Sequence, residues 1–235
     1  MKKLAIYLIM IAFFACQKEE DSMRKKVNLE AFHSIELNEA FEVKLIEGSD
    51  YSLEMEGMES FIKKMEYQIT DSVLVIDNSK RFKWSNPQNN IPKLWITCPK
   101  LELVTANESC NIKTMNPITT SEFGIILGSK ANVAEIETDN QIVFYWNNFP
   151  CSGKLTLRGQ TNELKIWNTA LMTVDASLLM TEFAYISNDS KGDCLVNVSE
   201  TLEYNLNGEG NLIVFGNPAE IIDQGSSNSG SILLR

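Results

Sequence analysis

The chain has 235 residues, a formal net charge of −10, a single histidine and 44% hydrophobic residues. Nucleic acids and anionic lipid surfaces both attract basic segments, so this acidic composition argues against electrostatic docking on either of them. About 210 residues remain beyond the N-terminal segment, which is enough for one large domain or two small ones.

The first sixteen residues have the layout of a secretory signal that ends at a cysteine. Lys2 and Lys3 form a short positive region, residues 4–14 are continuously apolar, and the small Ala15 precedes Cys16. As a helix the apolar stretch spans about 16 Å, roughly half of a bilayer core, so it is too short to cross a membrane. The cleavage phrase at residues 13–16 resembles a bacterial lipoprotein signal. We therefore expect residues 1–15 to be removed as a signal peptide and Cys16 to carry the lipid; an ordinary signal peptide with an incidental cysteine is the alternative.

Residues 16–26 are expected to form a tether between this lipid and the folded chain. The run from Gln17 to Asp21 is polar and acidic, as in a solvated linker. It also resembles the export tag of lipoproteins on the outer face of the outer membrane in Bacteroidetes-type bacteria. The sequence thus predicts an outer membrane lipoprotein exposed at the cell surface, attached to the membrane through its lipid anchor, with the periplasmic face as the alternative.

Four further cysteines lie at positions 98, 110, 151 and 194. No two of them have the Cys-x-x-Cys spacing, which argues against a zinc or iron–sulfur site. Export would permit disulfides, and four cysteines allow three connectivities, between which the sequence does not choose. Isolated buried thiols are the alternative, because cysteine packs well as a small apolar residue.

Most segments after the tether alternate apolar and polar residues between turn-forming residues. This period of two is typical of half-buried strands, and it is clear at residues 34–39, 41–45 and 51–55. Residues 58–65 are the one expected short helix, and the polar, proline-containing residues 81–92 are an expected loop.

From about residue 94 the chain repeats a unit of strand, small polar turn and strand, as in residues 154–166 and 202–214. Equivalent turns recur about every 20 to 30 residues, a period typical of solenoids. One coil cannot close a core, whereas stacked coils bury a continuous apolar column. The sequence therefore predicts an all-β parallel β-solenoid (β-helix) over residues 27–235, with a more irregular N-terminal strand region. An antiparallel sandwich is the alternative.

Several short phrases resemble, in order, the bacterial family of autotransporter adhesin heads, also called GIN domains, a domain of unknown function. They are a Phe-x-x-Ile phrase at 32–35, a strand and glycine turn at 41–48, a strand-proline-leucine phrase at 96–101, and Gly-x-Gly and Gly-Asn-Pro phrases at 208–210 and 216–218. The resemblance covers residues 27–235. It implies a right-handed parallel β-helix on a lipoprotein of Bacteroidetes-type bacteria, and it brings no catalytic residues with it.

The sequence offers little for catalysis. His33 is the one histidine, so no histidine-based triad or zinc triad is convincing, and no nucleophile elbow, phosphate loop or dinucleotide fingerprint occurs. Polysaccharide lyases and hydrolases with parallel β-helices use clustered carboxylates, and the candidates here are Asp139, Asp175, Asp189 and Asp193. The simpler interpretation is that these aspartates cap turns. We expect no catalytic residue, no metal site and no cofactor.

The densest group of aromatic residues predicts a binding face. It contains Phe144, Tyr145, Trp146, Phe149 and Trp167, near several asparagines, and the candidate binding residues are Tyr145, Trp146, Phe149 and Trp167. Exposed aromatic rings beside amide groups suit contacts with sugars or proteins, although alternate residues of a solenoid strand point into its core.

Together these observations predict a non-enzymatic cell-envelope lipoprotein, an adhesin or binding module for a surface protein or glycan. The alternatives are a β-helix enzyme of the polysaccharide lyase or hydrolase type, and a purely structural envelope component.

Overall fold

The computed structural model describes residues 21–79, 91–128, 130–148, 150–227 and 230–235. Cys16, most of the expected loop at 81–92 and Phe149 lie outside the described residues. The described residues form a sheet of sixteen strands and one four-residue helix. The elements are β1 (Ser22–Asn28), β2 (Ser34–Leu37), β3 (Glu42–Glu47), β4 (Ser52–Met58), α2 (Glu59–Ile62), β5 (Met65–Thr70), β6 (Val73–Asn78), β7 (Lys93–Cys98), β8 (Leu103–Ala106), β9 (Asn111–Thr114), β10 (Glu122–Leu127), β11 (Lys130–Asn147), β12 (Cys151–Ser190), β13 (Cys194–Leu206), β14 (Leu212–Gly216), β15 (Glu220–Asp223) and β16 (Ile232–Leu234).

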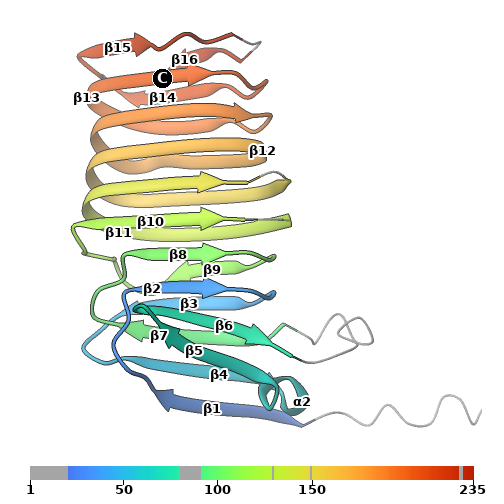
Figure 1. Ribbon diagram of the computed structural model, residues 1–235. Helices are drawn as coiled ribbons and strands as arrows, with labels where there is room; N and C mark the ends of the chain where they lie inside the picture. The colour runs from blue at the N-terminus through green and yellow to red at the C-terminus, as the bar shows by residue number, and fades with distance from the viewer. Residues whose placement is uncertain (1–20, 80–90, 129, 149, 228–229) are drawn as a thin grey trace, which may run out of the picture.

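The strands form two stacks, which we call the front sheet and the back sheet as they are seen in Figure 1. The front sheet contains β6, β2, β8, β10 and β15, and the back sheet contains β7, β3, β9, β14 and β16. The long strands β11, β12 and β13 bend around the column and contribute to both sheets. Front strands run left to right and back strands return as the chain rises, which is a right-handed turn. The predicted right-handed parallel β-solenoid is confirmed, with about six turns.

The lower end of the column is built differently from the coils above it. The strand β2 pairs in parallel with β6 below and β8 above, so the first coil in sequence lies between later segments. Beneath this coil the pairing becomes antiparallel, between β1 and β4, β4 and β7, and β5 and β6. This is the irregular N-terminal region that the sequence predicts. The expected helix at 58–65 is present as the shorter α2, which buries Phe61 and Ile62.

Residues 22–26, which the sequence places in the tether, belong to β1. Their positive side chains find partners on the lower end of the column. Arg24 pairs with Glu54 and lies over the Trp95 ring at 5.1 Å, and Lys25 lies 5.6 Å from the centre of the Tyr67 ring. The regular alternation of neighbouring strands is weak here, which is why this strand was not expected.

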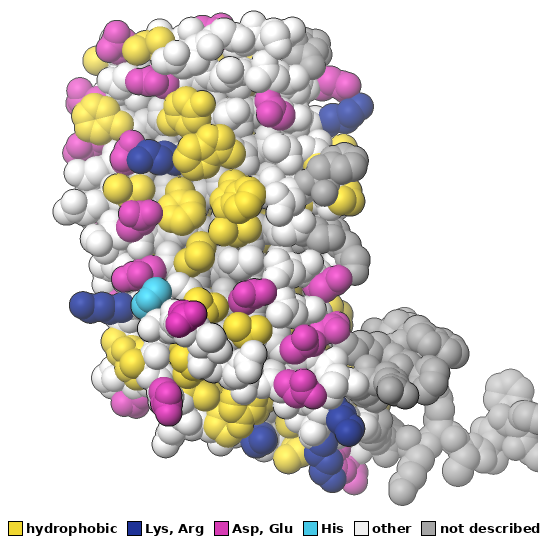
Figure 2. Space-filling view, viewed as in Figure 1, with side chains coloured by type: hydrophobic (Ala, Val, Ile, Leu, Met, Phe, Trp, Pro, Cys, Tyr) yellow, Lys and Arg dark blue, Asp and Glu magenta, His cyan; other side chains and the backbone are white. Residues whose placement is uncertain are grey.

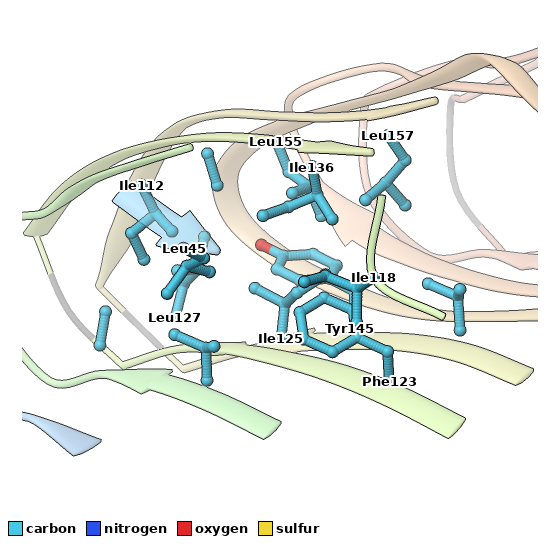
Figure 3. Packing of buried hydrophobic residues seen from close by; sticks show 14 of the residues in the cluster. Leu45, Ile112, Ile118, Phe123, Ile125, Leu127, Ile136, Tyr145, Leu155 and Leu157 are labelled. Carbon is cyan, nitrogen blue, oxygen red and sulfur yellow. The ribbon is translucent and has the colours of Figure 1, made fainter. Parts of the chain in front are cut away.

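The core is a set of apolar columns that run through the coils. Along one of them Ile35, Val104, Ile125 and Tyr145 are successive register partners, each at most 1% exposed. Figure 3 shows how such side chains from neighbouring coils fill the space between the two sheets. Full burial of one such side chain contributes about 1.5–3 kcal/mol, so stacking supplies the stability that a single coil lacks.

At the end of the front strands an asparagine ladder replaces apolar residues in the middle coils. The register position that holds Leu37, Ala106 and Leu127 in the lower coils is taken by Asn147 in the next one. Asn147 exchanges two hydrogen bonds with the backbone of Thr169, at 2.8 and 3.0 Å. One coil later Asn168 Nδ2 donates to Asn188 Oδ1 at 3.0 Å. These amides satisfy backbone groups at the turns and fix the stacking of the coils of β11 and β12.

The four cysteines at positions 98, 110, 151 and 194 are all buried free thiols, so the alternative of isolated thiols is confirmed. Burial raises the pKa of Cys98, Cys110 and Cys194 to about 12, and these groups are therefore protonated thiols at neutral pH.

Candidate binding face

The outer surface of the front sheet carries aromatic side chains from three successive coils. Trp146 and Trp167 are 39% and 41% exposed, and Phe183 is 47% exposed. Phe144 and Tyr185, which are half-buried, lie beside them on the same side of the strands. Figure 2 shows hydrophobic side chains gathered in several groups over the front sheet. We call these five aromatic residues the aromatic face.

Register and alternation bring these rings together. Phe144 pairs with Lys165, and Trp146 with Trp167, so the two tryptophans lie one strand spacing apart, about 4.8 Å at the backbone. The Trp167 and Tyr185 rings are tilted against each other at 49°, with their centroids 5.8 Å apart. This geometry falls in the range of favourable aromatic pairs, so the two rings hold each other in place.

Phe144 is held by a glycine. Gly124 is its register partner on β10, and a Cβ atom at Gly124 would overlap the Phe144 ring. The ring therefore lies close against the strand below, where only glycine leaves room for it. Three of the five rings, those of Phe144, Trp167 and Tyr185, are thus packed against a neighbour before any ligand arrives, which lowers the entropy lost on binding.

Two hollows lie on this face. The first, of about 620 Å³, is lined by Glu163, Lys165, Phe183, Tyr185 and Glu203 among others, and we call it the charged hollow. The second, of about 520 Å³, is lined by Phe144, Trp146, Trp167, Thr169, Ser187 and Asp189 among others, and we call it the tryptophan hollow. Both volumes fall within the range of about 300–1,000 Å³ that is usual for small-molecule sites.

The charged groups around the rings are predominantly acidic. Lys165 Nζ lies 3.0 Å from Glu163 Oε2, and Gln224 Nε2 donates to Glu203 Oε2 at 3.0 Å. Asp189 is exposed at the opposite end, in the tryptophan hollow. The two hollows are thus lined by three carboxylates and one ammonium group.

Of the four predicted binding residues, two lie on the outer surface, one is buried in the core and one is outside the described residues. Trp146 and Trp167 point outward and line the same hollow. The prediction that Tyr145 belongs to the binding face is wrong. Tyr145 is 0% exposed and belongs to the core column, because it precedes Trp146 by one residue and neighbouring residues of a strand point to opposite sides. Its buried hydroxyl has no hydrogen-bond partner among the described residues, and burial raises its pKa. Phe149 lies outside the described residues.

Phe144 belongs to the aromatic region that the sequence singles out, and it lies two residues before the outward Trp146, on the same side of the strand. Sequence reasoning missed Phe183 and Tyr185. Tyr185 and Phe183 required the exact coil length, because they join the face only through the register of β12, which no local pattern fixes.

Three of the four candidate acids, Asp139, Asp175 and Asp193, make local contacts, and Asp189 is exposed. Asp193 Oδ1 accepts a hydrogen bond from the backbone of Asn211 at 2.7 Å, and Asp139 accepts one from Gln160 at 2.9 Å. Burial opposes ionisation of Asp175, but hydrogen bonds from Lys154 and Ser177 hold the pKa of Asp175 below its ordinary value. These contacts agree with the simpler interpretation of turn and surface aspartates. His33 lies near Ser34 and Glu102 at the surface.

Among the described residues no cluster of three or more histidines, cysteines or acids is arranged to hold a metal ion. The same part of the chain contains no helix with the length and apolar character needed to span a bilayer.

Comparison with known proteins identifies the family. Residues 31–218 match the family model described as "Putative auto-transporter adhesin, head GIN domain", so the chain belongs to this family and the resemblance noted in the sequence is confirmed. No curated protein matches the chain.

Solved structures share the fold at low sequence identity. A "putative adhesin" from Bacteroides fragilis NCTC 9343 is 17% identical, with 94% of this chain and 100% of that chain covered and a TM-score of 0.82. A "putative adhesin" from Parabacteroides distasonis ATCC 8503 is 14% identical, with 92% and 98% covered and a TM-score of 0.66. A "putative lipid binding protein" from the same organism is also 14% identical, with 92% and 98% covered and a TM-score of 0.59. At these identities the likeness supports the fold alone.

Proposed function

Starting from this family membership, we propose that the chain is a lipid-anchored envelope protein whose solenoid presents a non-enzymatic binding face to a surface protein or glycan. The observation that carries the proposal is the aromatic face, where half-exposed rings lie together beside two hollows of ligand size. Exposed aromatic clusters on soluble proteins commonly mark interaction sites, because leaving them in water costs free energy. The adhesin description of the family agrees with a binding role.

The anchor that we propose is a lipid on Cys16, after removal of residues 1–15, in the outer membrane with the protein exposed at the cell surface. A short polar segment then leads into β1, and residues from there to 235 form one solenoid domain. The strand β1 lies at the lower end of the column, and the front strand at 163–168 lies five strand steps above β6. At about 4.8 Å per step, the aromatic face lies about 24 Å above β6, toward the middle of the column.

A non-enzymatic role is supported by the engagement of the acids. A glycosidase needs a pair of carboxyl groups that flank the scissile bond. Here Asp175 is paired with Lys154, and Asp193 accepts hydrogen bonds from Asn211. Of the three carboxylates that line the hollows, Glu163 and Glu203 have local partners, and Asp189 lies in the tryptophan hollow, separate from the charged hollow that contains the other two.

The proposal is tested on whole cells that express the full chain. Wild-type cells and cells with Trp146→Ala plus Trp167→Ala are offered labelled polysaccharides and extracellular matrix proteins, and binding is measured by flow cytometry. We expect binding that the double substitution removes and that Lys154→Ala, on the back sheet, preserves. Equal binding by all three strains, or release of shortened polysaccharide by the wild type, would contradict the proposal.

The anchor is tested separately. Incorporation of labelled palmitate is expected in the wild type and not in Cys16→Ser, and surface protease is expected to digest the protein on intact cells. Labelling that persists in Cys16→Ser would show that the lipid is elsewhere.

A further inference from the structure

We infer that the aromatic face binds an uncharged saccharide chain that crosses the front sheet along the strand direction, from the tryptophan hollow to the charged hollow. The inference rests on the proposed function, because it names the ligand of the same face.

The first step is the chemistry of the rings. Trp146 and Trp167 are open to solvent over about two fifths of their surface. Trp95, by contrast, is covered by Arg24 at 5.1 Å and Lys44 at 4.8 Å, and among the described residues no such cation lies over Trp146 or Trp167. Flat, open indole surfaces match the C–H faces of sugar rings, which are apolar although the edges of the sugar carry hydroxyls.

The second step is the surroundings of the rings. Sugar hydroxyls donate and accept hydrogen bonds at the ring edge, so a saccharide site needs both kinds of group beside the aromatic surface. The tryptophan hollow has Thr169, Ser187 and Asp189 at its border, and the charged hollow has Lys165 and Glu203. A purely apolar ligand would leave these groups without water or partners, which costs free energy.

The third step is charge. The hollows are lined by three carboxylates and one ammonium group, and that ammonium group is already paired with Glu163 at 3.0 Å. An anionic polymer, such as an acidic polysaccharide, would be repelled. A cationic peptide would be attracted by Glu203 and Asp189, but most of the polar lining is uncharged, as at Asn162, Thr169 and Ser187. Amide and hydroxyl groups pair with the hydroxyls of a neutral saccharide, so this lining favours an uncharged ligand.

The fourth step is the extent of the site. The two hollows meet at the register pair of Phe144, which lines the tryptophan hollow, and Lys165, which lines the charged hollow. From residue 163 to residue 168 the strand advances about 16 Å, at about 3.3 Å per residue. A ligand that uses both hollows is therefore extended, which fits an oligosaccharide chain and not a single sugar.

The inference is tested by calorimetric titration of the full chain carrying Cys16→Ser, purified without its lipid. The probes are uncharged gluco-, manno- and xylo-oligosaccharides of two to six units, uronic-acid oligosaccharides of the same lengths, and a lysine-rich peptide. We expect binding of at least one uncharged series, with affinity that rises with chain length. Trp167→Ala should weaken it at least about tenfold, as for other central aromatic contacts, and Lys154→Ala should leave it within about twofold.

Two positions show where the saccharide lies on the aromatic face. Phe183→Ala, in the charged hollow, should weaken binding of the six-unit oligosaccharide severalfold and leave binding of the two-unit oligosaccharide unchanged. Trp167→Phe, which keeps a ring, should retain more affinity than Trp167→Leu, and thermal unfolding of each variant separates lost folding from lost binding. Affinity that does not depend on length or on Phe183 would overturn the extended site.

The outcomes distinguish the inference from the proposed function. Binding of the uronic-acid series or of the lysine-rich peptide, weakened by Trp167→Ala, would overturn the uncharged saccharide and leave the aromatic face as a binding site. The same conclusion would follow if no probe bound in the calorimetric titration while cells bound a protein through Trp146 and Trp167. The absence of any binding that depends on these tryptophans would overturn both.

Discussion

The two outer surfaces of the same coils differ sharply. On the front sheet, the outward positions 144, 146, 167, 183 and 185 present phenylalanine, tryptophan and tyrosine rings. On the back sheet the equivalent positions hold ion pairs, between Lys113 and Glu135 at 2.9 Å and between Lys154 and Asp175 at 2.8 Å. The inward residues of both sheets are alike in being apolar and buried. Because the stability of the fold depends mainly on the inward residues, the outward residues can differ between the two sheets. The stability of the solenoid therefore does not explain the aromatic rings on the front sheet, whereas a binding role does.

The stability of a solenoid therefore resides in residues that alternate with those that we assign to binding. Leu164 is 0% exposed and its neighbour Lys165 lies on the outer surface. On the back sheet the same alternation separates Leu155, buried, from Lys154. Substitutions at adjacent positions can consequently separate the two properties.

The largest expected effect is on the core. Leu164→Ala removes a fully buried side chain and should lower the free energy of unfolding by about 2–5 kcal/mol, because the coils on either side cannot collapse into the cavity. Lys165→Ala, one residue later, should change it by less than about 0.5 kcal/mol. Urea denaturation followed by circular dichroism measures both. Equal losses would mean that the outward row also supports the fold.

The next effect separates the two faces. Trp146→Ala combined with Trp167→Ala should cost at least about 2 kcal/mol of binding free energy, as expected for central aromatic anchors. Since both rings are partly exposed, each substitution should lower the free energy of unfolding by only about 1–2 kcal/mol. Lys154→Ala on the back sheet serves as the matched control. A control that loses as much binding as the double variant would remove the distinction between the faces.

A smaller effect is expected where a glycine supports the aromatic face. Gly124→Ala introduces a Cβ that overlaps the Phe144 ring, which must rotate away from the strand at a cost of about 0.5–1.5 kcal/mol. Ligand affinity should fall although the fold remains. Gly153→Ala is the comparison, because Gly153 has φ of +120° and its added Cβ would meet the backbone of Asn132. This second substitution should act mainly on stability, and the opposite pattern of losses would contradict the assignment of Gly124.

The smallest effect concerns the charges of the back sheet. The hydrogen bond from Lys113 and its charge hold the pKa of Glu135 below its ordinary value. A lowered folded-state pKa contributes stability that is fully present above the ordinary value of 4.5 and is lost as the pH falls through the folded value. Because the pair is exposed, Glu135→Gln should cost less than about 1 kcal/mol at pH 7 and nothing at pH 2. Thermal midpoints at the two pH values measure this, and a cost that persists at pH 2 would argue against an ionic contribution.

The regular coils were predictable and the lower end was only partly so. Period-two alternation and small polar turns specify strands and stacking, because each inward residue must meet the residue of the next coil. The position of β2 between β6 and β8 was not predictable, since parallel pairing partners are decided by long-range packing. The strand β1 was missed because its partners, such as Trp95 and Tyr67, lie far away in sequence.

The part of the candidate site whose residues lie close together in the sequence was predictable. Trp146 and Trp167 were found because they lie in the densest aromatic region, and Tyr145 was included because density alone does not tell inward from outward. The contributions of Tyr185 and Gly124 arise only when coils of about twenty residues are placed in register. No local pattern fixes that register, since it depends on how many residues each turn contains.

The most direct measurement of the central claim is a crystal structure of the protein with an uncharged oligosaccharide that it binds. The account predicts sugar rings stacked on Trp146 and Trp167 and a chain that extends across the front sheet toward Phe183, with nothing on the back sheet. A saccharide seated against the ion pairs of Lys113 and Lys154, or against the ends of the column alone, would contradict it.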